Sequence, residues 1–251
     1  MHQLRRLRVG VVRKGFTKEE HVILQGLGTK WVRLPSGVVD DDVNNAASES
    51  EGHLLQMGLM YALRPFYVRS KKESVFVGSN GDRVVLRNDP DEGFKIEIHS
   101  DRDLELREGG PGEITVKVPT DEPPTLSVSR ALHKMAYLMF CVVRPDAIAD
   151  PGLQATRDLI AKGDLGSYRP YTEAFVAGAA PGFNFRFLVL EREAGTSVAA
   201  NIRLHHMDYI VMLAGPLPPT PKGSTRKDTV EPGGHTREEI TWRFDSMERR
   251  D

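Results

Sequence analysis

The sequence predicts an α+β protein made of two segments that meet near residue 122. Alternating apolar residues indicate strands in the middle of the chain and again near its C-terminal end. Between them, residues 127–143 carry apolar side chains at three- and four-residue spacing, which is typical of a helix with a buried face. The 251 residues suffice to bury a core, as one large domain or as two small ones.

The chain divides into four parts by composition and pattern. They are an N-terminal module at 1–68, a β-rich connector at 69–120, a C-terminal helix-plus-antiparallel-sheet domain at 121–215, and a Pro- and Gly-rich tail at 216–251. We expect the tail to be disordered, because its composition cannot supply a packed core.

The connector contains two periodic patterns. Apolar residues alternate with polar ones over 94–98 and over 114–118, and each run is bounded by Gly, Asp or Pro, as strands commonly are. The run DEPPT at 121–125 then breaks the chain. We interpret this run as the linker between the two segments.

The C-terminal domain begins with the helix predicted at 127–143. A second helix is predicted at 151–162, because Asp150 can cap its start, Pro151 suits its first turn and Gly163 suits its end. Strands are predicted after it at 183–189, 198–204 and 209–213.

The composition excludes several classes of protein. The net charge of −1 argues against a uniformly basic nucleic-acid coat but allows a local basic patch. No apolar run approaches the ~20 residues of a membrane span, and no long apolar stretch follows the basic N-terminus, as a signal peptide would require. The single cysteine, Cys141, excludes an intramolecular disulfide framework and a multi-cysteine zinc site. We expect a soluble cytoplasmic protein with no membrane partner.

Charge is distributed unevenly near the N-terminus. Residues 1–38 hold eight Arg or Lys and two Glu, a net charge of +6, whereas residues 39–56 hold five acidic residues and no basic one, a net charge of −5. Such blocks either fold against one another, surround a cation, or form two solvated surfaces. The run Asp40–Asp42 is more typical of a solvated turn than of a cation site. The candidates for contact with nucleic-acid phosphates, which can equally balance the acidic block, are Arg13, Lys14, Lys18 and Lys30.

The most informative stretch contains the adjacent pair Glu20 and His21. Hydrolysis of a phosphodiester needs a cation that neutralises developing charge, a neutral imidazole that takes a proton from water, and a group that orients this imidazole. Glu20 and Glu51 are oxygen ligands suited to Mg²⁺ or Mn²⁺. His21 is the candidate base, and Asn44 is the candidate to position either this imidazole or a strand near it. By itself, an adjacent Glu-His pair is more typical of a surface Glu beside a structural His.

Taken together, these residues resemble the HNH endonuclease family. The match is to a bacterial branch whose motif is similar to TKEHVIPQGLGG followed by GVVCDDCNN and a later Glu. Here the two halves are TKEEHVILQGLG at 17–28 and GVVDDDVNN at 37–45, with Glu51 at the matching distance. The segment SRALHKMA at 129–136 resembles the helix that follows the nuclease module in such proteins. The resemblance covers roughly residues 8–65 and 126–165.

The resemblance implies a ββα-metal module at 1–68, in which a β-hairpin packs on a helix around one catalytic cation. It implies Glu20 and Glu51 as ligands of Mg²⁺ or Mn²⁺, His21 as the water-activating base and Asn44 as the middle residue of the motif. The implied activity is phosphodiester hydrolysis. For a nuclease we expect DNA in preference to RNA as the partner, a choice that the sequence itself leaves open.

The sequence departs from this family where the structural zinc would bind. Members of the branch usually carry two pairs of cysteines, but here the second pair is Asp40 and Val43, so we expect no structural zinc. The usual Pro after the His-Val-Ile segment is Leu24. We therefore expect a zinc-free nuclease. The alternatives are an HNH-derived scaffold recruited to a small-molecule biosynthetic reaction, and a non-catalytic binding protein such as a defence or regulatory component.

Further candidates lie near the predicted site or on the helix at 127–143. His53 and Asn45 are candidates to line the pocket of Glu51. For His133, a satisfied core or interface histidine is the alternative to a functional role. If the two segments pack together, the residues placed to contact phosphate or the N-terminal module are Arg130, His133 and Lys134.

Overall fold

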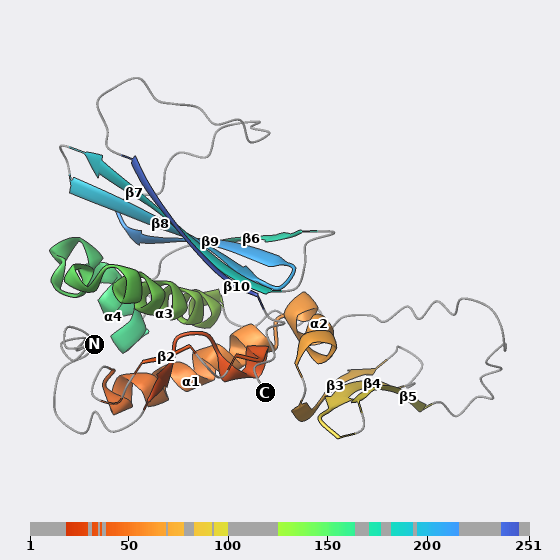
Figure 1. The fold of residues 1–251 in the computed structure, drawn as a ribbon. Coiled ribbons are helices and arrows are strands. Elements are labelled where there is room, and N and C mark those ends of the chain that lie inside the picture. The colour runs from red at the N-terminus through yellow and green to blue at the C-terminus, as the bar shows by residue number, and fades with distance from the viewer. Residues whose placement is uncertain are drawn as a thin grey trace.

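The computed structural model describes residues 19–29, 32–34, 36, 39–68, 70–77, 83–91, 93–99, 125–163, 171–176, 182–192, 195–215 and 237–245. It is an α+β structure with one five-stranded, one three-stranded and one two-stranded sheet, together with four α-helices among the described residues. Figure 1 shows helices α3 and α1 stacked below the large sheet, with the three-stranded sheet set to one side beyond α2.

The N-terminal part consists of a short hairpin followed by two helices. Strand β1 (Glu20–His21) pairs antiparallel with β2 (Arg33–Leu34), and the 3₁₀-helix η2 (Gln25–Leu27) lies between them. Helices α1 (Asp41–Leu55) and α2 (Gly58–Tyr67) follow.

The acidic run that we interpreted as a solvated turn is the start of α1. Asp40 is its N-cap, because Asp40 Oδ1 accepts hydrogen bonds from the backbone N–H groups of Asp42 and Val43 at 2.9 and 3.3 Å. Asp41 and Asp42 lie in the first turn, where the helix dipole favours negative charge. The acidic residues are therefore explained by helix initiation.

The predicted β-rich connector contains a three-stranded antiparallel sheet. Its strands are β3 (Ser70–Val77), β4 (Arg83–Asp89) and β5 (Gly93–His99), and β5 contains the predicted strand at 94–98. The predicted strand at 114–118 and most of the predicted linker at 121–125 lie outside the described residues.

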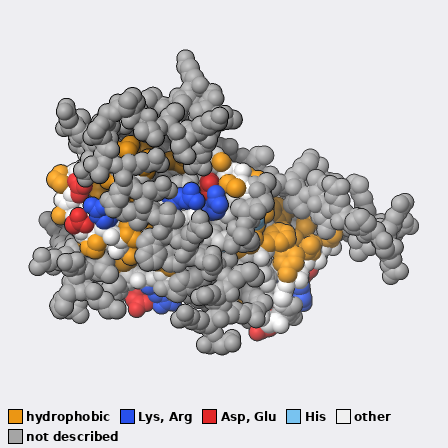
Figure 2. Space-filling model, turned by 45° about the horizontal axis from the view of Figure 1, so that its top comes forward, with side chains coloured by type: hydrophobic (Ala, Val, Ile, Leu, Met, Phe, Trp, Pro, Cys, Tyr) orange, Lys and Arg blue, Asp and Glu red, His pale blue; other side chains and the backbone are white. Residues whose placement is uncertain are grey.

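Helix α2 covers only part of the small sheet. The rings of Tyr61 and Phe76 are 5.5 Å apart, and those of Phe66 and Phe94 are 4.8 Å apart. Phe66, Ile96 and Ile98 nevertheless stay at least 36% exposed. Figure 2 shows apolar side chains gathered on this side of the molecule.

The C-terminal domain contains the two predicted helices. Helix α3 (Thr125–Val143) includes the predicted range 127–143. The predicted second helix begins as the 3₁₀-helix η4 (Pro151–Leu153), capped by Asp150, and continues as α4 (Gln154–Lys162), which ends at Gly163 with φ +61°. A short 3₁₀-helix, η3 (Pro145–Ala149), connects α3 to this segment.

The large sheet is antiparallel with the strand order β10-β7-β8-β9-β6. Three of its strands include the predicted ranges 183–189, 198–204 and 209–213. The five strands are β6 (Tyr171–Phe175), β7 (Gly182–Arg192), β8 (Gly195–Leu204), β9 (Met207–Ala214) and β10 (Arg237–Asp245).

Strand β10 corrects the prediction that the whole tail at 216–251 is disordered. Arg237–Asp245 pairs with β7 along its full length, in a register that places Ile240, Trp242 and Phe244 opposite the three phenylalanines of β7. These three residues alternate with polar ones, so a strand pattern was present in the sequence. The Pro and Gly content of the preceding residues led us to predict disorder for the whole tail.

Helix α3 is at the centre of the molecule. Every residue from Val128 to Cys141 is buried, because α3 packs against β7 and β9 on the sheet side and against α1 and α4 elsewhere. The prediction assigned α3 one buried face, whereas the helix is enclosed all round. Its polar side chains must therefore find partners inside the protein, because an unpaired buried charge is costly.

Of the helices in the described ranges, Thr125–Val143 alone is long and apolar enough to cross a membrane. Most of this helix is enclosed by the rest of the fold.

Candidate functional site

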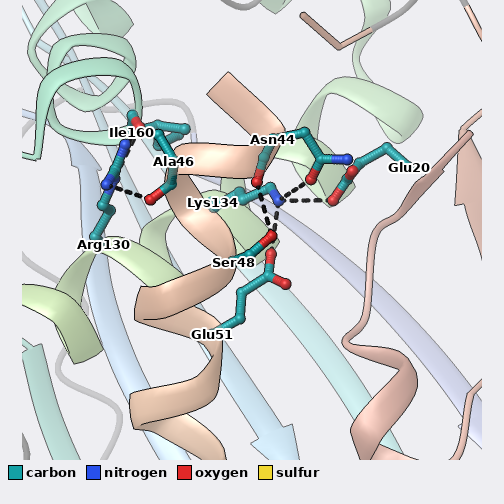
Figure 3. Close-up of polar contacts among 8 residues, drawn as sticks. All are labelled: Glu20, Asn44, Ala46, Ser48, Glu51, Arg130, Lys134 and Ile160. Atoms are coloured by element: carbon teal, nitrogen blue, oxygen red, sulfur yellow. Dashed lines mark hydrogen bonds and ion pairs between the residues drawn. The ribbon is translucent and has the colours of Figure 1, made fainter. Parts of the chain in front are cut away.

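Three of the residues predicted for the site meet at a single nitrogen atom (Figure 3). Lys134 Nζ donates to Asn44 Oδ1 at 3.0 Å and to Glu51 Oε1 at 2.6 Å, and it lies 2.7 Å from Glu20 Oε1. An ammonium group has three N–H donors, so these three oxygens saturate it. The place where the predicted ligands converge is occupied by a cation that the protein itself supplies.

Four residues from three elements make up this group, which we call the Lys134 cluster: Glu20, Asn44, Glu51 and Lys134. Glu20 comes from β1. Asn44 and Glu51 are seven residues apart on α1, which is close to two helical turns, so both face the same side. Lys134 comes from α3, and its residue is only 1% exposed. The cluster therefore joins the N-terminal part of the chain to the central helix.

The electrostatics of the cluster leave an excess of negative charge when both carboxylates are ionised, because one ammonium faces two carboxylates. Burial raises the pKa of Glu20 above its ordinary value, and the charge of Glu51 acts in the same direction. The ammonium of Lys134 opposes this rise by stabilising the ionised carboxylate. Lys134 Nζ contacts Oε1 of Glu20 and Oε1 of Glu51.

His21 lies beside the cluster but outside its hydrogen bonds. It pairs with Arg33 across the β1–β2 hairpin, and Arg33 in turn forms an ion pair with Glu19 at 3.0 Å. Partial burial lowers the pKa of His21, Arg33 lowers it further, and Glu19 and Glu51 partly offset this. The imidazole is therefore held in its neutral form at pH 7, which a general base requires.

Asn44 does not make the predicted orienting contact with His21. Asn44 Oδ1 accepts from Lys134, and no hydrogen bond joins Asn44 to His21 in the described part of the chain. The Nδ1 atom of His21 is buried and has no hydrogen-bond partner among the described residues. The His21 side chain thus lies beside the cluster, but Asn44 does not hold it in orientation.

The other predicted pocket residues of the N-terminal part, His53 and Asn45, are not members of the Lys134 cluster. His53 is half-buried on α1, two residues after Glu51 and so on another side of the helix. Asn45 is exposed. The candidate phosphate-contacting residues Arg13, Lys14, Lys18 and Lys30 lie outside the described residues.

Arg130 links three helices. Its guanidinium donates to Ala46 O on α1 at 2.8 Å, and to Ile160 O and Ala161 O on α4 at 2.7–3.2 Å. Gly163 leaves room for it, since a Cβ there would lie 2.9 Å from the guanidinium. Arg130 therefore contacts the N-terminal module, as we predicted for packed segments.

His133 is fully buried on α3. Its Nδ1 atom lies 2.7 Å from Ser129 O, one helical turn earlier. This is the arrangement of a core histidine, the alternative that we considered for it.

The two positions at which the resembled motif carries cysteines, Asp40 and Val43, have structural roles. Asp40 caps α1, and Val43 is 7% exposed within the core. Cys141 is buried on α3, and burial raises the pKa of its thiol to about 12. A thiol with this pKa stays protonated and unreactive at neutral pH.

The donor chemistry of the Lys134 cluster suits a hard cation. Within the part of the chain that the structure describes, no group of three or more His, Cys, Asp or Glu side chains could hold a metal ion. The cluster instead offers two carboxylates and one amide oxygen, which are the ligand types preferred by Mg²⁺ and Mn²⁺. These oxygens already surround one positive charge.

We predicted that Lys134 would contact phosphate or the N-terminal module if the two segments pack together, but we did not assign it to the site of Glu20, Asn44 and Glu51. The signal was a lysine within an otherwise apolar helix, since such a residue needs an internal partner. The helix pattern could not show that this partner lies on α1 and β1.

No known family model, curated protein or solved structure matches the chain.

Proposed function

We propose that the protein is an HNH-like phosphodiester hydrolase whose site combines His21 with the oxygens of Glu20, Asn44 and Glu51. The observation that supports this is the convergence of these three oxygens within 2.6–3.0 Å of a single positive charge. The chain order of hairpin strand, hairpin strand and helix is that of the ββα arrangement implied by the resemblance. DNA is the proposed substrate.

The chain's own residues divide the chemistry between them. His21 accepts a proton from the attacking water at its unprotonated ring nitrogen, since its lowered pKa keeps the imidazole neutral at pH 7. Glu20, Asn44 and Glu51 are the residues that would hold Mg²⁺ or Mn²⁺. When bound, such a cation neutralises charge on the scissile phosphate and on the leaving oxygen.

A second candidate function is that of a non-catalytic, HNH-derived binding protein. It is favoured by the saturation of Lys134 Nζ with three oxygens and by the buried Nδ1 of His21, which has no partner among the described residues. A general base is normally held in orientation through its second nitrogen. In this candidate, the cluster serves only to join α1 and β1 to α3.

A cleavage assay separates the two candidates. The full chain is incubated with supercoiled plasmid in Mg²⁺ or Mn²⁺, and with single-stranded RNA in parallel. We expect metal-dependent nicking of the plasmid that EDTA abolishes. His21→Ala should lower the rate by about 10²-fold or more, the usual contribution of a general base.

The matched control is His99→Ala, which removes an exposed histidine on β5. It should leave the rate unchanged. Absence of cleavage by the wild-type protein, or full activity in a folded His21→Ala variant, would contradict the hydrolase proposal.

A further inference from the structure

Lys134 is the one residue of the cluster to which the proposed function assigns no role. It is also the residue that binds all three oxygens, and it is almost completely buried. A merely solvated lysine would not occupy this place. Its position in the site therefore has a consequence for any other cation that uses the same oxygens.

An ammonium and a divalent cation cannot both occupy the meeting point of these oxygens. Mg²⁺ binds its oxygen ligands at about 2.0–2.1 Å, so an ion at this point would overlap Nζ, which lies 2.6–3.0 Å from the same oxygens. Even an ion displaced toward the second carboxylate oxygens would meet the repulsion of a positive charge in a buried, weakly screened region. A divalent cation that binds to these oxygens must therefore displace the Lys134 ammonium or bind against its repulsion.

The lysine is held in this place by the packing of its helix. Lys134 lies on α3, where every neighbouring residue from Val128 to Cys141 is buried. One turn earlier on the same helix, Arg130 donates to Ala46 O on α1 and so fixes α3 against the helix that carries Asn44 and Glu51. The packing of α3 thus fixes the backbone of Lys134. The ammonium can leave the three oxygens only if the lysine side chain changes its conformation.

We propose that Lys134 is an internal competitor of the divalent cation, and that its ammonium keeps the metal affinity of Glu20, Asn44 and Glu51 low. Lys134 in this sense acts through the metal site and does not itself touch the reacting atoms. The inference rests on the proposed function only for the identity of the ligand, a divalent cation.

Mn²⁺ binding to the full chain tests the inference without any substrate. Affinity is measured by isothermal titration calorimetry and by the loss of the free Mn²⁺ electron paramagnetic resonance signal. We expect Lys134→Met to bind one Mn²⁺ per chain at least tenfold more tightly than the wild-type protein. Glu51→Gln added to Lys134→Met should remove this gain, because it removes one of the two carboxylates.

Two further variants control for misfolding of Lys134→Met and for a general effect of removing a lysine. Lys134→Gln removes the charge but keeps an amide donor for the carboxylates, so it should fold even if Lys134→Met does not, and it should show the same direction of change. Lys162→Met removes an exposed lysine at the end of α4 and should leave Mn²⁺ affinity unchanged. A role of Lys134 confined to folding would leave the Mn²⁺ affinity of the folded variants unchanged.

The inference is overturned if the folded Lys134 variants bind Mn²⁺ no more tightly than the wild-type protein, or if the gain survives Glu51→Gln. The cleavage assay gives an independent result. Tighter Mn²⁺ binding in Lys134→Met without cleavage by any variant would support the inference and reject the hydrolase. Cleavage by the wild-type protein with unchanged Mn²⁺ affinity in the Lys134 variants would do the reverse.

Discussion

At the scale of single residues, the stability of the molecule depends on how Lys134 is neutralised. A buried ion pair contributes little compared with a well-packed apolar pair, but the loss of one partner leaves an uncompensated charge. Lys134 has two carboxylate partners of unequal burial, since the Glu20 side chain is 6% exposed and the Glu51 side chain 21%. Water therefore has access to one partner and hardly any to the other.

Loss of Glu20 is expected to destabilise the fold more than loss of Glu51. Water can replace a carboxylate at position 51 more readily than at position 20. We expect Glu20→Ala to lower the free energy of unfolding by about 3 kcal/mol and Glu51→Ala by about 1 kcal/mol. Urea denaturation followed by circular dichroism measures both. Equal losses, or a larger loss for Glu51→Ala, would contradict this account of the cluster.

At the scale of elements, local patterns predicted most of the C-terminal domain. Buried and partly exposed residues alternate along most of β7 and β8 because one face of each strand is buried. Helix α3 shows helical spacing because it packs on several neighbours. Strand β10 has the same alternation but was missed, because the composition averaged over 216–251 predicted disorder. The resemblance implied a helix in the N-terminal module, but the bounds of α1 were not predicted, since its acidic start is equally typical of a turn.

The capping contact at the start of α1 carries its own prediction. Asp40 is 2% exposed and accepts from two backbone N–H groups, so Asp40→Ala leaves both donors without this acceptor. We expect a loss of about 1 kcal/mol in the free energy of unfolding. Asp42→Ala, which removes an exposed first-turn charge but no cap, should cost about 0.3 kcal/mol. Thermal denaturation of the three proteins compares them, and a larger loss at Asp42 would reject the cap.

At the scale of the whole molecule, the site was only partly accessible from sequence. The motif resemblance grouped Glu20, Asn44 and Glu51, and these residues do meet. It gave no partner for them, because Lys134 is more than 80 positions away from Asn44 and Glu51 and reaches them only through the packing of α3 on α1. Such a contact depends on tertiary structure, which neither periodicity nor spacing encodes.

A second long-range contact joins the N-terminal part to the large sheet through His205. This residue lies in the turn between β8 and β9 with φ +56°, and its ring stacks on Tyr67 of α2 with centroids 4.2 Å apart. His205 Nε2 lies 3.3 Å from Leu27 O, a carbonyl that can only accept, so Nε2 carries the proton. The pKa of His205 is lowered to about 4, mainly by burial; the hydrogen bond to the Leu27 carbonyl opposes this shift, and the neighbouring His206 adds to it.

This lowered pKa predicts how the fold responds to acid. In the unfolded chain a histidine has a pKa near 6.5, so between about pH 6.5 and 4 the unfolded state binds the proton and the folded state does not. Stability should therefore fall as the pH drops through this window, by up to about 3 kcal/mol from His205. His205→Asn removes the titrating ring and tolerates the left-handed backbone, so it should be less stable at pH 7 but lose less on acidification. Urea midpoints measured from pH 7 to 4 compare the two proteins. Parallel curves would show that His205 does not couple folding to protonation, and that its contacts with Tyr67 and Leu27 stabilise the junction at every pH alike.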